Sequence, residues 1–427
     1  MPNEPNEPYD RRTAWKPAPR PEWVARLNEE GESLNIKSIV PLDEASLLNE
    51  AMRNSGLSDF GDDRWRAHFR VLIHAIENEA KLNLTGRILT RSDLLIYLEA
   101  RLAITECYKQ NPEIEDEVIT EPVFIVGSGR SGTTIFHEAL SQDDQFRVVR
   151  RWEAMFPCPP PTEEIYLTDP RIEKAHKLIT LPERIAPEWK TMHAQAGDLP
   201  VECIEFLYLT FLSEVYYCSF QIPSYVEYFR KQDIRETFDW HKRILKLLQW
   251  KYKLPHWLLK GPTHMPVLPQ LLETYPDAKL IFMHRDQVTT TDSVVSVQGT
   301  IYWWRTDDPW SGSMLDDVMM VEGRVNLWDR IIGWMEDGTI PKGQYTNVIY
   351  QDFSRDPMAA IRAAYQEIGL TMEDGEAEKI ETYLVNKPKG VFGKHDYKTS
   401  GGGGDVAANE RKALHRYMEY FGVPSEG

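Results

Sequence analysis

From residue 123 onward the chain contains four short runs of mostly apolar residues, each typical of a strand buried on both faces of a sheet. Two of these runs flank a stretch with helical spacing, so that strand, helix and strand follow one another within about thirty residues, the size of a βαβ unit. Such units build parallel sheets. The runs are 123–126, 257–260, 279–284 and 347–350, and the helix between the second and third runs is expected over 265–275.

Elsewhere apolar residues recur at the three- and four-residue spacing of a helix with one buried face. The first three such stretches precede any strand, which predicts a helical cap at the N-terminus. The sequence therefore predicts an α/β fold: a three-layer α/β/α arrangement with a central parallel sheet, plus the helical N-terminal cap. The glycine-rich loop after the first strand, described below, makes this arrangement P-loop-like. The expected helices cover 41–54, 64–80, 92–108, 133–140, 237–254, a stretch from 357 onward, and 409–420.

The first 37 residues differ from the rest, because they hold many prolines and charges and little periodic apolar pattern. This composition is typical of a flexible arm. An arm that orders on a partner subunit would imply a homo-oligomer, and the sequence leaves the oligomeric state open. We divide the chain into a flexible N-terminal arm (1–37), a helical N-terminal region (38–118) and an α/β domain (119–427).

The stretch 202–217 is apolar and strongly aromatic. A core helix is the simpler interpretation, and aromatic lining of an acceptor pocket is the alternative. No apolar run has the length that spans a bilayer, and the N-terminus lacks the apolar core of a secretory signal. We therefore expect a cytoplasmic protein without a transmembrane segment, whose four cysteines are reduced thiols.

The formal net charge of the chain is −17. A surface this acidic argues against duplex nucleic acid as a partner. It also argues against a polyanionic acceptor, which the surface would repel unless a local basic groove intervened. A small neutral or phenolic molecule with a hydroxyl group is easier to accommodate.

The strand 123–126 and the helix 133–140 are joined by the loop Gly127-Ser128-Gly129-Arg130-Ser131-Gly132. Unpaired N–H groups and the positive end of a helix dipole make such a loop an anion site. Its spacing is close to that of the nucleotide P-loop, but Thr133 stands where the P-loop has its lysine. That lysine normally reaches the β- and γ-phosphates. The loop is therefore expected to bind a phosphate rather than a triphosphate, and a turn without a ligand is the alternative.

The sequence RSGTT after an apolar strand resembles the 5′-phosphosulfate loop of sulfotransferases that use 3′-phosphoadenosine 5′-phosphosulfate (PAPS). The resemblance implies that PAPS is the donor and 3′,5′-adenosine bisphosphate (PAP) the product. It also implies that no metal is required, because arginine, lysine and backbone dipoles would meet the charge that magnesium otherwise neutralises. The loop residues implied in donor binding are Gly129, Arg130, Ser131, Gly132, Thr133 and Thr134.

A second match follows the strand 279–284. Arg285 leaves the end of this strand and Ser293 lies in the helix after it. The planar donor fork of an arginine suits a phosphate, and a serine hydroxyl can complete the site. In the PAPS-dependent family an arginine and a serine at this spacing bind the 3′-phosphate. An ion pair between Arg285 and Asp286 on the surface is the alternative.

The chemistry would need a group that stabilises the leaving phosphate and a base that takes the acceptor proton. Lys260 ends a parallel strand and so should face the crevice where α/β folds bind ligands. For the base, Glu153 in RWEAMFP resembles the catalytic glutamate of tyrosylprotein and bacterial sulfotransferases, with Trp152 beside it as an apolar contact. His264 and His193 are rival bases.

Three further stretches resemble parts of the same family. Tyr350, in YQD followed by a proline, matches a segment that places a tyrosine near the nucleotide. The stretch 389–395 resembles the loop that closes over the 3′-phosphate and adenine, with Lys389, Gly390 and Lys394 at the matching positions. The stretch 56–65 is similar to the helical region that precedes the domain in a broad bacterial branch of the family.

The predicted function is thus transfer of a sulfuryl group from PAPS to a hydroxyl of a small or lipid-like acceptor by in-line displacement. Two alternatives stay open from the sequence. A P-loop kinase-like enzyme that uses ATP would need the lysine that is absent at position 133. A non-catalytic protein that keeps the nucleotide fold would bind PAP without any transfer.

Overall fold

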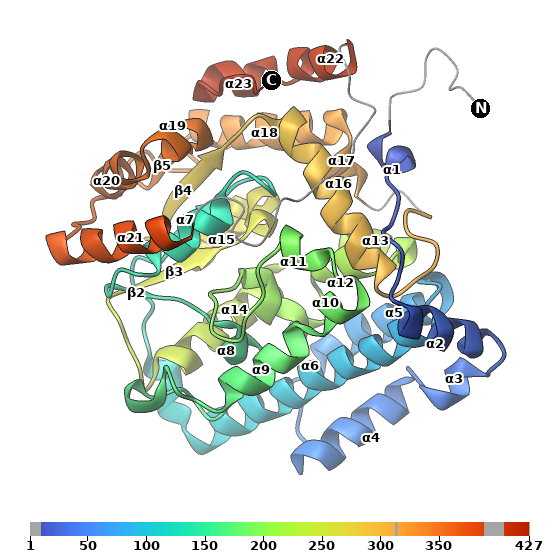
Figure 1. Cartoon of the computed structure of the whole chain (residues 1–427). Helices are drawn as coiled ribbons and strands as arrows, with labels where there is room; N and C mark the ends of the chain where they lie inside the picture. Colours follow the sequence, from blue (N-terminus) through green and yellow to red (C-terminus); the bar gives the residue numbers. More distant parts are fainter. Residues whose placement is uncertain (1–9, 312–314, 388–404, 427) are drawn as a thin grey trace.

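The computed structural model describes residues 10–311, 315–387 and 405–426 (Figure 1). Its centre is a five-stranded sheet with the strand order β2-β3-β1-β4-β5, and every neighbouring pair is parallel. The prediction of a parallel α/β fold with four of these strands is therefore confirmed. The strands are β1 (Val123–Val126), β2 (Phe146–Arg147), β3 (His256–Lys260), β4 (Lys279–His284) and β5 (Tyr345–Ile349).

The edge strand β2 was not predicted, because two residues are too few to carry a period or an apolar run. The last predicted strand is shifted, since Tyr350 begins a helix instead of ending β5. The predicted helix over 92–108 is part of a longer helix that starts at Leu84, where the side chain of Asn83 caps the first turn.

Helices cover both faces of the sheet, as the three-layer prediction requires. On β1, Val123 and Ile125 share one apolar core with the helices α7, α20 and α21. The alternate residues Phe124 and Val126 share a second core with α14, α15 and α18. This alternation follows from the two-residue period of a strand. The helices after β1 and before β3 are α7 (Thr133–Leu140), α8 (Arg151–Met155), η2 (Glu163–Ile165), α9 (Arg171–Ile179), α10 (Leu181–Ile185), α11 (Trp189–Met192), η3 (Cys203–Thr210), α12 (Val215–Ser219), α13 (Pro223–Phe229) and α14 (Arg235–Gln249), where η marks a 3₁₀ helix.

The remaining helices complete the outer layers. Those after β3 are η4 (Pro262–Val267), α15 (Leu268–Thr274), α16 (Gln287–Trp303), α17 (Asp316–Met319), α18 (Val321–Glu336), α19 (Tyr350–Arg355), α20 (Pro357–Ile368), α21 (Asp374–Asn386), α22 (Asp405–Ala413) and α23 (His415–Phe421). Those before β1 are α1 (Arg11–Ala14), α2 (Glu22–Glu32), α3 (Ile36–Ile39), α4 (Glu44–Ser55), α5 (Arg64–Glu79), α6 (Leu84–Gln110) and η1 (Pro112–Asp116).

The aromatic stretch 202–217 lies mostly in the core. Phe206, Phe211 and Tyr216 are buried, and Phe211 and Tyr216 pack with the N-terminal helices α4 to α6. The single helix favoured by the sequence is not formed. Phe211 adopts a left-handed backbone conformation with φ of 55° and separates η3 from α12. Among the described residues, no helix combines the length and the apolar composition needed to cross a membrane.

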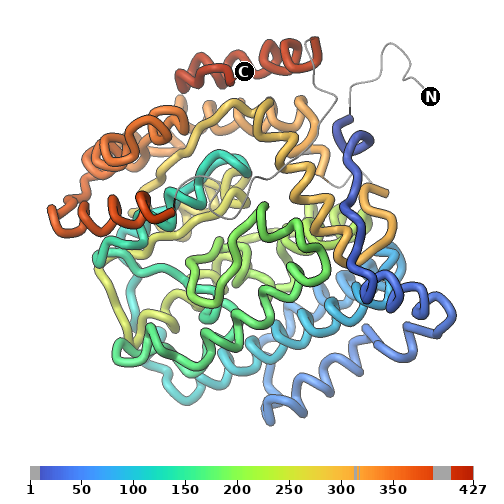
Figure 2. The backbone as a smooth tube through the Cα atoms, in the orientation of Figure 1, coloured from blue at the N-terminus to red at the C-terminus, as the bar shows by residue number. Residues whose placement is uncertain are grey.

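The N-terminal segment differs from the flexible arm that its composition predicts. From residue 10 onward it contains helices, of which α1 packs on α16 and α2 packs on α6 (Figure 2). The guanidinium group of Arg11 is buried and pairs with Asp292 of α16 at 2.5 Å and with Glu410 of α22. Glu410 also pairs with Arg324 of α18 at 3.0 Å. These buried ion pairs join the two ends of the described chain to the helices beside the sheet.

We expect Gly86→Ala to destabilise the protein, because a Cβ atom there would lie 2.0 Å from the backbone oxygen of Arg305. Overpacking of this kind typically costs about 1–3 kcal/mol. The matched control is Gly333→Ala in α18, where a Cβ would meet nothing within 4 Å. That substitution should stabilise the protein by up to about 1 kcal/mol, since alanine favours helix. Urea unfolding measures both, and equal effects of the two substitutions would contradict the close approach of α6 to residue 305.

Candidate active site

The loop predicted to bind an anion lies between β1 and α7, at the carboxyl edge of the sheet. Gly132 has a φ of 94°, and a Cβ atom there would come within 2.5 Å of the Tyr350 ring. Gly127 is needed for a different reason, because its Cβ would lie 2.6 Å from the carbonyl oxygen of Met283 on β4. Arg130 also has a positive φ, of 68°. Two glycines and a strained arginine thus bend the chain tightly around the start of α7.

One polar group inside this loop is left without a partner. Ser131 is fully buried, and its hydroxyl makes no hydrogen bond within the described part of the chain. A buried hydroxyl without a partner is costly and calls for an explanation such as a ligand. The backbone N–H groups at the start of α7 and this hydroxyl together suit an anion.

Lys260 lies where its position at the end of β3 predicts. Its side chain is 2% exposed, and its Nζ donates to the hydroxyl of Thr134 in the first turn of α7 at 3.1 Å. The register explains the contact, because β3 pairs with β1 and Lys260 stands opposite Ile125, close to the start of the loop. A buried ammonium beside the loop can stabilise negative charge that develops there.

The acidic partner of Lys260 is Glu202, which the sequence analysis did not single out. Its carboxylate lies 2.9 Å from Nζ, and its side chain keeps 24% of its exposure. Burial alone would raise the pKa of Glu202, but the charge and hydrogen bond of Lys260, together with His193 and His137, outweigh it, and the pKa lies below its ordinary value. Glu202 is therefore an ionised carboxylate at neutral pH. Its only signal in the sequence was its place at the start of the aromatic stretch, which says nothing about Lys260.

On the other side of the loop, four of the residues predicted to bind PAPS lie together. Arg130 donates from Nε to the hydroxyl of Ser293 at 3.0 Å and from a terminal nitrogen to the carbonyl of Met192 at 3.0 Å. Arg285 donates to the backbone carbonyl of Arg130 at 3.0 Å. Its guanidinium also stacks 4.2 Å from the centre of the Tyr350 ring. The contacts join the loop to β4, α16 and α19.

Arg285 already binds a carboxylate in this structure. Its Nε and a terminal nitrogen donate to the two oxygens of Glu426, each at 2.8 Å. This is the bidentate geometry with which arginine binds carboxylates and phosphates. Arg411 and Thr289 donate to the backbone carbonyl of Glu426 and help to hold it. The sequence analysis did not predict that an acidic residue from this distant segment would lie on Arg285.

Glu153 does not lie where a base would. It is fully buried and its carboxylate forms an ion pair with Arg147, which is also buried. The same carboxylate accepts from the N–H of Arg150 at 2.9 Å and from the hydroxyl of Tyr166 at 3.1 Å. These donors use both of its oxygens, and the side chain is 0% exposed in this structure. The structure thus gives Glu153 a structural place: it caps α8 and neutralises Arg147.

The two histidines named as rival bases differ in their surroundings. His264 is 2% exposed, and its ring lies among Phe124, Phe238 and His241. Burial lowers the pKa of His264 to about 4. His193 is half-buried and stacks on Trp189, and its pKa is lowered by burial and by the Lys260 ammonium. Of the two, only His193 is accessible.

Three predicted positions, Lys389, Gly390 and Lys394, lie outside the described residues. The other predicted residues gather at one edge of the sheet, except Glu153 and His264, which are enclosed by other side chains. The edge therefore combines the loop that is predicted to bind an anion with two arginines, a buried lysine and an accessible carboxylate. Such a combination suits the transfer of a group between anionic and hydroxyl oxygens.

Comparison with known proteins defines the class. A model of the Sulfotransferase family matches residues 122–374, which is more than half of the chain. The omega-hydroxy-beta-dihydromenaquinone-9 sulfotransferase Stf3 of Mycobacterium bovis is 25% identical over 290 residues, covering 67% of this chain and 70% of that protein. The chain therefore belongs to the sulfotransferase family and is an enzyme of that class.

Solved structures support the same fold. Sulfotransferase STF1 from Mycobacterium tuberculosis superposes with a TM-score of 0.72 at 26% identity, covering 87% of this chain and 98% of that one. Sulfotransferase STF9 from Mycobacterium avium superposes with a TM-score of 0.75 at 23% identity, covering 90% and 98%. Both structural alignments cover more of this chain than residues 122–374, which the family model matches. The similarity in fold therefore includes part of the helical region before β1.

We expect Glu153→Ala to destabilise the protein by about 3–5 kcal/mol, because it leaves the buried charge of Arg147 unpaired. The melting temperature and urea unfolding measure the effect. The double variant Arg147→Met, Glu153→Leu is the control, since it removes both charges and should recover most of the loss. A single variant as stable as the wild type would show instead that the carboxylate is not held by Arg147, and would restore Glu153 as a candidate base.

Proposed function

We propose that this enzyme transfers the sulfuryl group of PAPS to a hydroxyl group of a lipid-like acceptor and releases PAP. The observation that carries the proposal is the contact of Lys260 with both Thr134 of the loop and Glu202. It puts a cation and an accessible carboxylate at the same end of the anion site. The lysine that a triphosphate would need is replaced by Thr133, so no observation favours the kinase-like alternative.

The residues at the edge of the sheet fit the donor. The loop N–H groups, Ser131 and Arg130 would hold the 5′-phosphosulfate, and the hydroxyl of Ser131 supports this because it is buried without a partner. Arg285 and Ser293 would hold the 3′-phosphate. The bidentate carboxylate of Glu426 supports that role, since it shows that the fork of Arg285 accepts an anion here. Lys389, Gly390 and Lys394 stay predicted contacts to the same phosphate.

In the proposed reaction the acceptor oxygen forms a bond to sulfur while the bond from sulfur to the phosphate oxygen breaks. Lys260 stabilises the charge that builds on the departing phosphate oxygen. Glu202 takes the proton of the acceptor hydroxyl, in place of the predicted Glu153, because Glu202 is ionised, accessible and next to Lys260. His193 is the second candidate for the base, since it is accessible on the same side.

Two observations support an acceptor with an apolar body. The relative Stf3 is named for an omega-hydroxy menaquinone as its acceptor. In this chain, Met192 accepts the hydrogen bond from Arg130 and belongs to an apolar cluster with Ile185, Trp189 and Trp304. This cluster borders the predicted donor site through Met192, and His193, which stacks on Trp189, extends it toward Lys260. A hydroxyl at the end of an apolar molecule would suit this position.

The first test is calorimetric titration with PAP beside ATP and magnesium. We expect PAP to bind more tightly than ATP, and Arg285→Ala to weaken PAP binding by roughly ten- to a hundredfold, the value of a charge-assisted hydrogen-bond pair. Glu426→Ala should strengthen PAP binding, because its carboxylate competes for Arg285. Glu419→Ala, an exposed carboxylate on α23, is the control and should change nothing. Tighter binding of ATP would overturn the proposed donor.

The second test concerns the base. The enzyme is incubated with labelled PAPS and a series of hydroxylated isoprenoids and phenols, and an acceptor is recognised by the label that it takes up. The turnover of the variants is then compared with that acceptor. We expect Glu202→Gln to lower kcat by about 10²–10⁴, the usual contribution of a general base, with PAP affinity nearly unchanged.

The matched control is Glu205→Gln. Glu205 is of similar exposure to Glu202 and pairs with Arg151 at 2.6 Å, but not with Lys260. This variant should keep kcat within a few-fold. If Glu202→Gln stays active and His193→Ala loses turnover, the base is His193, and the assignment of Glu202 is wrong.

A further inference from the structure

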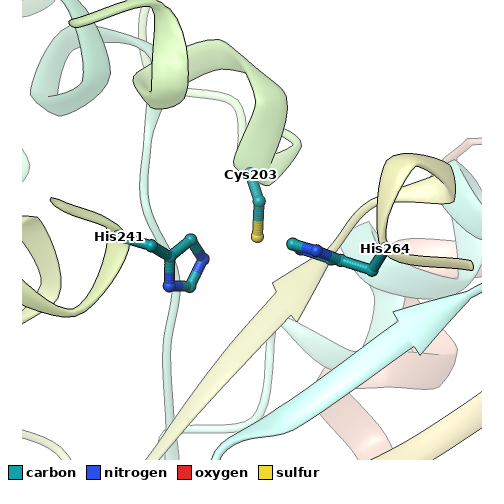
Figure 3. A group of neighbouring side chains, drawn as sticks. All are labelled: Cys203, His241 and His264. Carbon is teal, nitrogen blue, oxygen red and sulfur yellow. The ribbon is translucent and has the colours of Figure 1, made fainter. Parts of the chain in front are cut away.

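A second group of chemically active side chains lies behind the site, in the apolar core. Cys203, His241 and His264 come from η3, α14 and η4, and each is buried, with exposures of 0%, 0% and 2%. One ligand atom from each of them, a sulfur and two ring nitrogens, lies within 4.8 Å of the others. Figure 3 shows the sulfur of Cys203 lying between the two imidazole rings.

Each of the two imidazole rings has one nitrogen atom without a hydrogen bond to any described residue. Nε2 of His241 and Nε2 of His264 have no hydrogen-bond partner in the described part of the chain. A buried polar atom without a partner destabilises the folded state, because it has given up its hydrogen bond to water. Two of them in one place are unusual in a native core, where most buried polar atoms are paired or bind an ion or a water.

The hydrogen bond of Tyr275 orients one of the rings. Its hydroxyl lies 2.7 Å from Nδ1 of His241, so Nε2 is the nitrogen left for the cluster. When Nδ1 donates its proton to this hydroxyl, Nε2 presents its lone pair. A metal-binding histidine is typically held in this way by a partner on its other nitrogen. The walls around the rings are Phe124, Phe206 and Phe238.

We propose that Cys203, His241 and His264 bind a zinc ion. One sulfur and two imidazole nitrogens form a ligand set that suits zinc. At ordinary Zn–N and Zn–S lengths, the ligand atoms of a tetrahedral site lie about 3.5 Å apart. Because the three atoms here are already within 4.8 Å, an inward movement of about 1 Å brings them to bonding distance, and a water would take the fourth position, as in other zinc sites with three protein ligands.

The position of the ion suggests what it does. Cys203 directly follows Glu202, and its sulfur accepts from the backbone N–H of Lys260. His264 lies four residues beyond Lys260, in the segment that continues from β3. The ion would therefore hold together the two segments that carry the Glu202–Lys260 pair. This positioning role rests on the proposed function, whereas zinc binding itself does not.

The test measures the metal content of the full chain. The protein is produced in zinc-supplemented medium and dialysed against a metal-chelating resin before the measurement. We expect about one zinc per chain by mass spectrometry, and below about 0.1 in Cys203→Ser and in His264→Asn. Cobalt added to the metal-free protein should give the absorption of a thiolate-to-cobalt bond, and Cys203→Ser should abolish it. Cys107→Ser and His176→Gln, which alter the same residue types outside the cluster, should keep zinc and spectrum.

A variant that fails to fold would lose metal for a trivial reason, so the wild type is tested by itself. A strong chelator should lower its melting temperature, and added zinc should restore it. Wild-type protein without zinc, without cobalt absorption and with no response to the chelator would overturn the proposal and leave a metal-free thiol–imidazole cluster. None of these measurements needs PAP or an acceptor, so a failed PAP titration would not affect them.

Discussion

The active edge of this enzyme depends on the parallel pairing of β1 with β3 on one side and β4 on the other. In a parallel sheet the carboxyl ends of neighbouring strands meet at one edge. That pairing brings the loop after β1, Lys260 at the end of β3 and Arg285 just after β4 into one region, although they are far apart in the sequence. A change of register by one residue would turn Lys260 to the opposite face of the sheet and leave its charge buried among apolar side chains.

Carboxylates then take different roles according to their surroundings. Glu153, Glu202 and Glu426 each pair with a cation near the site. Glu153 is enclosed with Arg147 and hydrogen-bonded on both oxygens, so its charge serves the fold. Glu202 shares its cation with the loop and stays accessible, so its charge is available for chemistry. Glu426 pairs with Arg285 in the geometry of a bound anion, which makes it a competitor of any phosphate there.

The helices around the sheet show a similar use of buried charge. Glu410 pairs with both Arg11 and Arg324, and so connects the first described helix to α22 and α18. Buried ion pairs of this kind add little net stability over apolar packing, but they make the arrangement specific, because each charge left alone would be costly. This explains how a segment with the composition of a flexible arm packs in one defined place.

Much of the fold followed from local patterns in the sequence. Four strands, most of the long helices and the glycine-rich loop are encoded by apolar periodicity and by residues that tolerate unusual backbone angles. The positions of Lys260 and Arg285 also followed, because each is at or just beyond the end of a strand and the parallel sheet gathers such ends. Ser293 followed from its place in the helix after β4.

The partners of these residues were decided by the tertiary structure alone. Arg147 lies in the basic stretch before Glu153, but nothing in the sequence indicates that the two are buried together under Tyr166. Nothing near Glu202 indicates that it lies on Lys260. The cluster of Cys203, His241 and His264 likewise joins three segments without any metal-binding spacing in the sequence. Local propensity is a property of neighbouring residues, whereas burial, pKa and ion pairing depend on which distant segments meet, and only the packed chain determines that.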